Sequence, residues 1–288
     1  MTSETAAVEE KPSATPTVAL ALGGGGARGL AHIHVIEVLD ELGIKPVVIA
    51  GSSIGAIMGA AMASGMSGAD IRDYTLSTLG DRVGVVNKLW SLRPSSIGEA
   101  MAGGLPFGRF NLERVLKAFL PKPVPSKFGE LKIPLKVLVT DYYGHREVVV
   151  EEGELYPALA ASAALPAVFS PVRVNGRIMI DGGFMNPVPF EHVMGRADIV
   201  IGIDVAGVPE GNADEMPTMF DSLYGATQLM MQANISLRLK LHTPDILLRP
   251  TVSHFRVLDF LRAREVLADS IGIRDELKRA IETEIARH

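Results

Sequence analysis

Ser53 is the first residue whose surroundings suggest chemistry. It is the centre of a G-x-S-x-G pattern at residues 51–55, which follows a short apolar run at 47–50 and precedes a run of small residues at 56–63. Where a strand turns sharply into a helix at such a pattern, the glycines allow the tight bend and the serine projects from the top of a sheet. Ser53 is therefore a candidate nucleophile, although the same pattern also occurs in ordinary turns.

Asp181 is the second candidate. It ends the second arm of a hairpin that the Asn-Gly pair at 175–176 predicts, and two glycines follow it. An acid at a strand end, before residues that let the backbone turn away, is placed to project into a crevice. Taken alone it is more typical of a turn aspartate, so its role depends on what it faces.

A glycine-rich loop at residues 23–29 separates the apolar run 17–22 from a stretch whose apolar residues recur at helical spacing as far as Leu42. This order predicts a strand, a loop and a helix that ends at Gly43. Because the strand at 47–50 and the helix that starts at Ser53 repeat the order, residues 17–65 form two β-turn-α units, which are typical of a parallel sheet. Their helix N-termini should lie side by side and stabilise negative charge beside Ser53.

The glycine loop has two competing interpretations. Gly24, Gly26 and Gly29 fit the G-x-G-x-x-G fingerprint of dinucleotide-binding proteins, but residues 50–52, where an acid is expected, are Ala-Gly-Ser. No Lys followed by Ser or Thr comes after the glycines, as a nucleotide P-loop requires. We therefore do not expect nucleotide binding. A loop that merely lets the helix pack closely on the sheet remains open.

The composition excludes several classes of function. The 288 residues are enough for one large α/β domain or two small ones, and 47% hydrophobic with 21% charged residues is ordinary for a compact globular core. The absence of cysteine excludes disulfides and thiolate chemistry, and no histidine spacing is typical of a metal site, so neither a metal nor a cofactor is predicted. A net charge of −5 gives no overall attraction to nucleic acid.

The chain carries no recognisable signal peptide or membrane span. Residues 1–16 are rich in Ala, Ser, Thr, Glu and Pro, which predicts a disordered tail. No uninterrupted apolar run approaches the roughly 20 residues of a spanning helix. We expect a soluble, cytoplasmic protein whose membrane contact, if any, is transient and peripheral.

The remaining elements follow from periodicity and turn signals. Residues 81–108, with the single tryptophan Trp90, are either a lid over the site or irregular structure packed on the core. The other predicted elements are strands at 135–140, 147–150, 172–174, 177–180, 198–205 and 245–249, and helices at 111–120, 159–166, 218–242 and 260–288.

Three blocks in order, at 24–29, 51–55 and 181–183, resemble the patatin-like phospholipase family, and residues 161–171 look like the segment before the family's aspartate. The resemblance covers about 17–205. It implies a three-layer α/β/α sandwich with a mainly parallel sheet, a catalytic core at 17–205, and an extension at 206–288 packed on the same domain. His34 departs from the family, since relatives are expected to carry glycine there.

The resemblance also implies roles for the site residues. Ser53 would be the nucleophile and Asp181 its catalytic partner in hydrolysis of an acyl lipid, phospholipid or lysophospholipid before neutral glyceride. The motif glycines and the loop would support them: Gly24, Gly25, Gly26, Ala27 and Arg28 in the oxyanion-hole loop, and Gly29, Gly51, Gly55, Gly182 and Gly183 at the turns.

The residues themselves suggest how such a site would work. Asp181 would accept the serine proton, and burial should raise its pKa from the ordinary value near 3.9. The N–H of Ile54 would join the loop amides in holding an oxyanion. Arg28 would either steer anionic head groups or pair with a carboxylate near the helix start.

Several alternatives stay open. His192, His242 and His254 follow Asp181 in the order of a Ser-Asp-His triad, although no flanking motif marks any of them. The Met230-Met231 pair could line an acyl channel, but core packing is the commoner use of methionine. The protein could transfer the acyl group to an alcohol or thiol, or bind lipid with an idle site.

Overall fold

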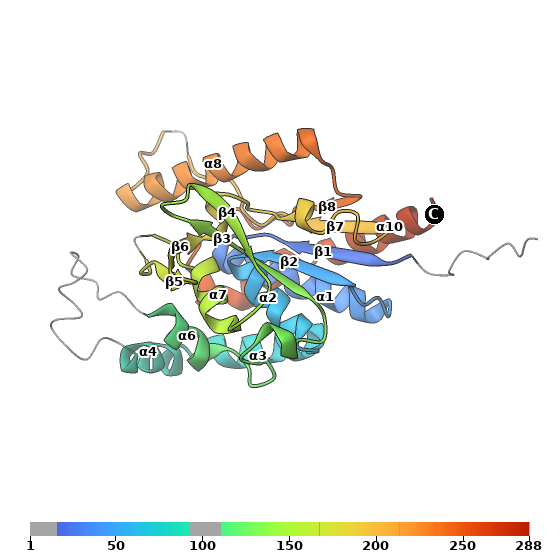
Figure 1. Ribbon diagram of the computed structural model, residues 1–288. Helices are drawn as coiled ribbons and strands as arrows, with labels where there is room; N and C mark the ends of the chain where they lie inside the picture. Colours follow the sequence, from blue (N-terminus) through green and yellow to red (C-terminus); the bar gives the residue numbers. More distant parts are fainter. Residues whose placement is uncertain (1–15, 93–110, 167, 213, 288) are drawn as a thin grey trace, which may run out of the picture.

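The computed structural model describes residues 16–92, 111–166, 168–212 and 214–287. Of the predicted tail at 1–16, only Pro16 belongs to the described residues. Residues 93–108 of the predicted lid also lie outside them. Figure 1 shows a central sheet with helices on both sides, which confirms the predicted three-layer α/β/α sandwich.

The sheet has the strand order β5-β6-β3-β2-β1-β7-β8, and β4 pairs with β3. The strands are β1 (Val18–Leu22), β2 (Val48–Ser52), β3 (Leu135–Asp141), β4 (Arg146–Val150), β5 (Val172–Val174), β6 (Arg177–Asp181), β7 (Ile199–Ile203) and β8 (Ile246–Leu248). The pairs β1–β2, β1–β7, β2–β3 and β7–β8 are parallel. The pairs β3–β4, β3–β6 and β5–β6 are antiparallel.

One edge of β3 carries two strand ends in succession. Leu138 pairs with Ser52, the last residue of β2, and the next residue, Val139, pairs with Asp181, the last residue of β6. Because β4 pairs with residues 137–141 of β3, it occupies the opposite edge. The ends of β2 and β6 therefore meet along β3.

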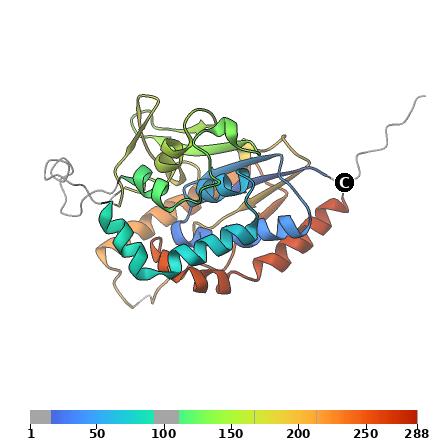
Figure 2. The same cartoon turned by 90° about the horizontal axis from the view of Figure 1, so that it is seen from below.

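The buried strands alternate between two cores because successive side chains of a strand point to opposite faces. Leu20 and Leu22 of β1 join the larger core, whereas Ala19 and Ala21 join the smaller core. The larger core includes side chains of α1 (His32–Glu41), α2 (Ile54–Ala63), α7 (Leu155–Ser162), α9 (Ala263–Asp269) and α10 (Ile273–Ile285). Figure 2 shows α1, α10 and α3 (Gly68–Gly80) side by side on this face.

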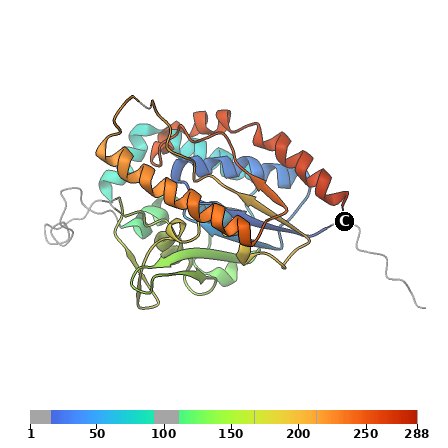
Figure 3. The ribbon, with the colours of Figure 1, turned by 90° about the horizontal axis from the view of Figure 1, so that it is seen from above.

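The smaller core lies under α8 (Met219–Leu241), which runs across the opposite face of the sheet in Figure 3. Met231 and Ile235 of this helix are buried there. In the part of the chain that the structure describes, no helix has both the length and the apolar character required to cross a bilayer.

Two helices begin elsewhere than the sequence predicts. The glycine loop leads first into a 3-10 turn, η1 (Gly26–Ala31), and α1 begins only at His32. Gly26 has a φ of +61°, and the N–H of Ala27 donates to the carbonyl oxygen of Val257. α7 begins at Leu155 rather than 159, since Pro157 is tolerated in the first helical turn.

The region predicted as a lid or irregular structure is partly helical. Residues Arg82–Ser91 form α4, which the side chain of Asp81 caps by accepting the N–H of Gly84. After the undescribed segment, α6 (Leu112–Phe119) follows as expected.

Gly55 fixes how closely α2 approaches β1. A Cβ at Gly55 would lie 2.0 Å from the carbonyl oxygen of Leu22, whereas a Cβ at Gly80 would meet nothing within 4 Å. We expect Gly55→Ala to lower the free energy of unfolding by about 3 kcal/mol or more, because backbone must move. Gly80→Ala should change it by less than about 1 kcal/mol. Urea unfolding of both variants tests this, and equal stabilities would contradict it.

Candidate active site

Ser53 stands at a strained turn between β2 and α2. Its φ of +53° and ψ of −123° lie in a region that a residue with a side chain rarely adopts. The N–H of Ser53 donates to the hydroxyl of Ser162 at 2.8 Å, and that hydroxyl donates to the carbonyl oxygen of Leu138 at 2.6 Å. Helix α7 and strand β3 therefore hold the serine in its turn.

Asp181 accepts a hydrogen bond from the Ser53 hydroxyl. The Oγ of Ser53 donates to Oδ2 of Asp181 at 2.7 Å, and the N–H of Gly183 donates to Oδ1 at 2.8 Å. The hydroxyl of Thr140 fixes the backbone by donating to the carbonyl oxygen of Asp181 at 2.9 Å. Burial raises the pKa of Asp181 to about 6, although the bonds from Ser53 and Gly183 lower it.

The glycine loop offers fewer donors than the sequence suggests. The N–H of Gly24 already donates to the carbonyl oxygen of Pro187 at 2.9 Å, and that of Ala27 donates to Val257. In the described part of the chain, no acceptor faces the N–H groups of Gly25, Gly26 and Ile54. Gly24 and Ala27 therefore shape the loop, and only the other three amides are free to hold an oxyanion.

Arg28 is buried and does not pair with a carboxylate in the described part of the chain. It is 1% exposed, and its Nε and Nη1 donate to the carbonyl oxygens of Val205 and Phe255, each at 3.0 Å. Its Nη2 donates to the hydroxyl of Tyr224 at 2.6 Å. The side chain thus ties the glycine loop to the C-terminal part of the chain, and none of its described hydrogen-bond partners is a carboxylate.

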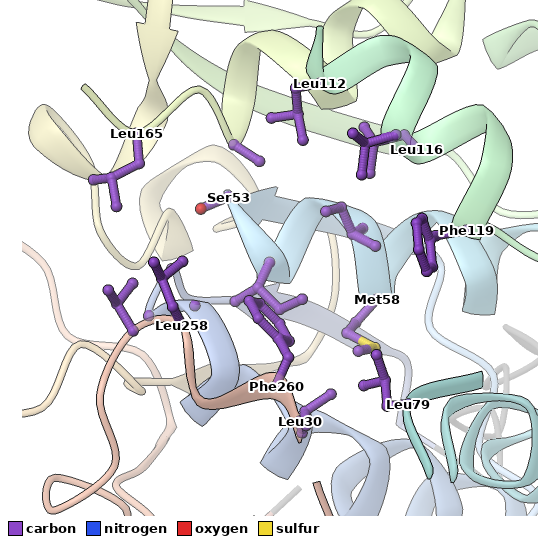
Figure 4. Close-up of a pocket in the computed structure, with 18 of the residues that line it drawn as sticks. Leu30, Ser53, Met58, Leu79, Leu112, Leu116, Phe119, Leu165, Leu258 and Phe260 are labelled. Atoms are coloured by element: carbon purple, nitrogen blue, oxygen red, sulfur yellow. The ribbon is translucent and has the colours of Figure 1, made fainter. Parts of the chain in front are cut away.

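A pocket of about 530 Å³ opens at Ser53, within the usual size range of ligand pockets. Helices α2, α3 and α6 each turn residues of one face toward it, and most are apolar (Figure 4). These are Ile54, Ile57, Met58 and Ala61 of α2; Ile71, Tyr74, Thr75, Thr78 and Leu79 of α3; and Leu112, Val115, Leu116 and Phe119 of α6. In Figure 4, Leu116 and Phe119 lie to one side of Ser53, and Leu165 and Leu258 to the other.

None of the described histidines lines this pocket. His192 lies 3.2 Å from Glu147 and His254 2.9 Å from Asp269, and His242 is exposed. His32 is buried with its Nε2 at 2.9 Å from the carbonyl oxygen of Gly23, and burial lowers its pKa to about 4. His34 is buried with its Nε2 at 2.8 Å from the carbonyl oxygen of Leu267 and does not line the pocket.

Two residues of the site, Ser162 and Tyr224, were not identified from the sequence, and only one of the two methionines at 230–231 lines the pocket. Ser162 is the one polar residue within the alanine run 160–164, which is a signal that could have marked it. Tyr224 carried no such signal. Met231 is buried and lines the pocket, whereas Met230 is 61% exposed.

The family model described as patatin-like phospholipase matches residues 20–194. An uncharacterized NTE family protein of Mycobacterium tuberculosis is 36% identical over 209 residues, 72% of this chain and 54% of that protein. Patatin-like phospholipase domain-containing protein 6 of Homo sapiens is 30% identical over 222 residues, 76% of this chain and 15% of that protein.

A lysophospholipase of Yarrowia lipolytica is 26% identical over 282 residues, 86% of this chain and 18% of that protein. This chain therefore spans about half or less of the curated relatives named here. Among solved structures, VipD from Legionella pneumophila aligns with a TM-score of 0.48 and 13% identity over 93% of this chain and 67% of that chain.

Burial of Asp181 makes stability depend on pH. Because the pKa is about 6 in the folded protein and about 3.9 when unfolded, its contribution to stability is full below pH 4 and is lost as pH rises through 6. We expect Asp181→Asn to be more stable than the unchanged protein above pH 7, by on the order of 3 kcal/mol, and this advantage to vanish near pH 4. Urea unfolding from pH 4.5 to 8 measures the difference, and a constant difference would contradict the assignment.

Proposed function

The chain belongs to the patatin-like phospholipase family, and on this premise we propose that it hydrolyses acyl ester bonds of lipids with Ser53 as nucleophile and Asp181 as its base. The observation that carries the proposal is the buried 2.7 Å hydrogen bond from Ser53 to Asp181, two residues that line an apolar pocket. The unengaged N–H groups of Gly25, Gly26 and Ile54, which border the same pocket, support it further.

The first half of the reaction forms an acyl-enzyme. Oγ of Ser53 attacks the ester carbonyl carbon while its proton passes to Oδ2 of Asp181, which a pKa of about 6 leaves mostly ionised at neutral pH. The three free amides hold the oxyanion, and each such donor contributes on the order of 3 kcal/mol. When the carbon–oxygen bond breaks, Asp181 returns the proton to the departing alkoxide.

The second half regenerates the enzyme. Asp181 takes a proton from a water molecule that attacks the acyl carbonyl carbon, and the same amides hold the second oxyanion. Collapse of this intermediate releases the fatty acid, and Asp181 returns the proton to Oγ of Ser53. No histidine is required, since one carboxylate serves both halves.

The pocket wall favours a long acyl chain as the substrate group. The described lining residues include no Lys, Arg or His, and Asp181 is their one charged side chain. We assign the acyl chain to the part of the pocket that α2, α3 and α6 line, which we call the acyl arm. This assignment is in line with a phospholipid or lysophospholipid substrate. The pocket-lining residues Val86, Leu258 and Leu261 are exposed apolar side chains, which suit brief contact with a lipid surface.

The dyad predicts which substitutions abolish activity. We expect Ser53→Ala and Asp181→Asn each to lower kcat/KM for a medium-chain fatty acid ethyl ester by about 10³-fold or more, because the nucleophile or its base is lost. His192→Ala and His254→Ala serve as matched controls and should change it by less than about threefold. Titration of the released acid measures all four, and a thousandfold loss in either histidine variant would replace the dyad by a triad.

The acyl arm predicts a change in chain-length preference. Ala61 lines the pocket eight residues beyond Ser53 in α2, about 12 Å along the helix axis. We expect the series Ala61→Val, Ala61→Leu and Ala61→Phe to shift the optimum progressively to shorter chains, with hydrolysis of long-chain esters at least tenfold slower in the last variant. Activity on a butyrate ester controls for folding, and an unchanged profile would place the chain elsewhere.

A further inference from the structure

We propose that Tyr224, supported by Arg28, is the residue that binds an oxygen atom in the alcohol part of the substrate. The inference rests on the proposed function, because it assigns the second side of the ester that Ser53 would cleave. It implies that the substrate is an ester of a polyol such as glycerol, which carries a further hydroxyl or phosphate oxygen close to the scissile bond.

The hydroxyl of Tyr224 has a proton to donate into the pocket. Tyr224 lies on α8 and lines the same pocket as Ser53, Asp181 and the glycine loop. Its oxygen accepts a hydrogen bond from Nη2 of Arg28 at 2.6 Å, so its own proton must point elsewhere. No described residue accepts that proton, and the pocket is the space that the side chain borders.

Arg28 makes this hydroxyl a strong donor. The guanidinium is fully buried, has no carboxylate among its described partners, and spends its other bonds on two backbone carbonyls. Burying a cation without an anion costs free energy, and in the low dielectric of the interior its charge polarises the groups to which it is hydrogen-bonded. The Tyr224 hydroxyl therefore offers a proton polarised by a positive charge, and hydrogen bonds of this kind are stronger than neutral ones.

The position of Tyr224 indicates the alcohol side rather than the acyl side. Arg28, which holds the tyrosine, also bonds the carbonyl oxygen of Phe255, three residues before Leu258. In Figure 4 Leu258 lies on the other side of Ser53 from Phe119, which borders the acyl arm. An ester seated with its acyl chain along α2 thus directs its alcohol part toward the loop that carries Leu258.

Other hydroxyls on that side are already engaged. Thr227, one turn further along α8, also lines the pocket, but its hydroxyl donates to the carbonyl oxygen of Leu223 at 3.1 Å. The described lining holds no cationic side chain, so the substrate meets no positive charge directly. The Tyr224 hydroxyl, which Arg28 polarises, is the group that carries the influence of that charge to the pocket. A hydroxyl or a phosphate oxygen would be accepted there, whereas an alcohol without such an oxygen would leave the donor unpaired.

The test compares three esters of the same acyl chain: the ethyl ester, the 1-monoacylglycerol and the lysophosphatidylcholine. We expect Tyr224→Phe to lower kcat/KM for the two glycerol lipids by about 10- to 100-fold, mainly through KM, and for the ethyl ester by less than about threefold. A larger loss on lysophosphatidylcholine than on the monoacylglycerol identifies a phosphate oxygen as the bound atom. Equal losses on these two glycerol lipids, with the ethyl ester unaffected, identify a glycerol hydroxyl. An equal loss on all three esters would overturn the proposal, because Tyr224 would then act on the ester group itself.

A binding measurement keeps the test independent of catalysis and of folding defects. Tyr156→Phe is the matched control, since the Tyr156 hydroxyl donates to the carbonyl oxygen of Val124 and does not line the pocket. In the Ser53→Ala background, an ether-linked lysophosphatidylcholine should bind about 10- to 100-fold more weakly when Tyr224→Phe is added, and unchanged when Tyr156→Phe is added. Equal affinities in all three proteins would overturn the inference. If the unchanged protein hydrolyses no ester, the proposed function fails, while this binding comparison still decides the role of Tyr224.

Discussion

The site depends on the way β3 pairs along one edge. Two successive residues, Leu138 and Val139, pair with the last residues of β2 and β6, so strands of opposite direction end face to face. Ser53 follows one of these ends and Asp181 is the other, which places their side chains within a hydrogen bond of 2.7 Å. A one-residue slip of either strand would turn the side chains to the other face of the sheet and separate the pair.

This arrangement stores unfavourable energy that neighbouring contacts offset. Ser53 occupies a strained backbone region, and the carboxylate of Asp181 is buried with a raised pKa. The Ser162 hydroxyl bridges Ser53 to β3, and the Gly183 N–H satisfies the second carboxylate oxygen. Hydrogen bonds from Ser53 and Gly183 limit the rise that burial causes, so the pKa of Asp181 is about 6 and the carboxyl is mostly ionised at neutral pH, as the proposed base must be.

Sequence reasoning predicted what short segments determine. The strand, turn and helix around Ser53 and the hairpin at 175–176 follow from periodicity and from residues that permit tight turns. The three-layer fold was implied by the resemblance to the patatin-like phospholipase family. Sequence reasoning failed where a partner comes from far along the chain. Pro187 occupies the N–H of Gly24, and Val205 and Phe255 receive Arg28, which no local pattern reveals. Position in the glycine loop therefore did not separate the free amides from the engaged ones.

These distant partners also determine how much of the chain the site requires. The family model ends at residue 194, yet Val257 binds the N–H of Ala27, and Val205, Phe255 and Tyr224 hold Arg28. Strand β8 pairs with β7 and extends the same sheet. Gly25 and Gly26 lie between Gly24 and Ala27, whose N–H groups are both hydrogen-bonded. The partner of Ala27, Val257, lies beyond the matched region. The geometry of the proposed oxyanion site therefore depends on Val205, Tyr224, Phe255 and Val257, all of which lie beyond the residues that the family model matches.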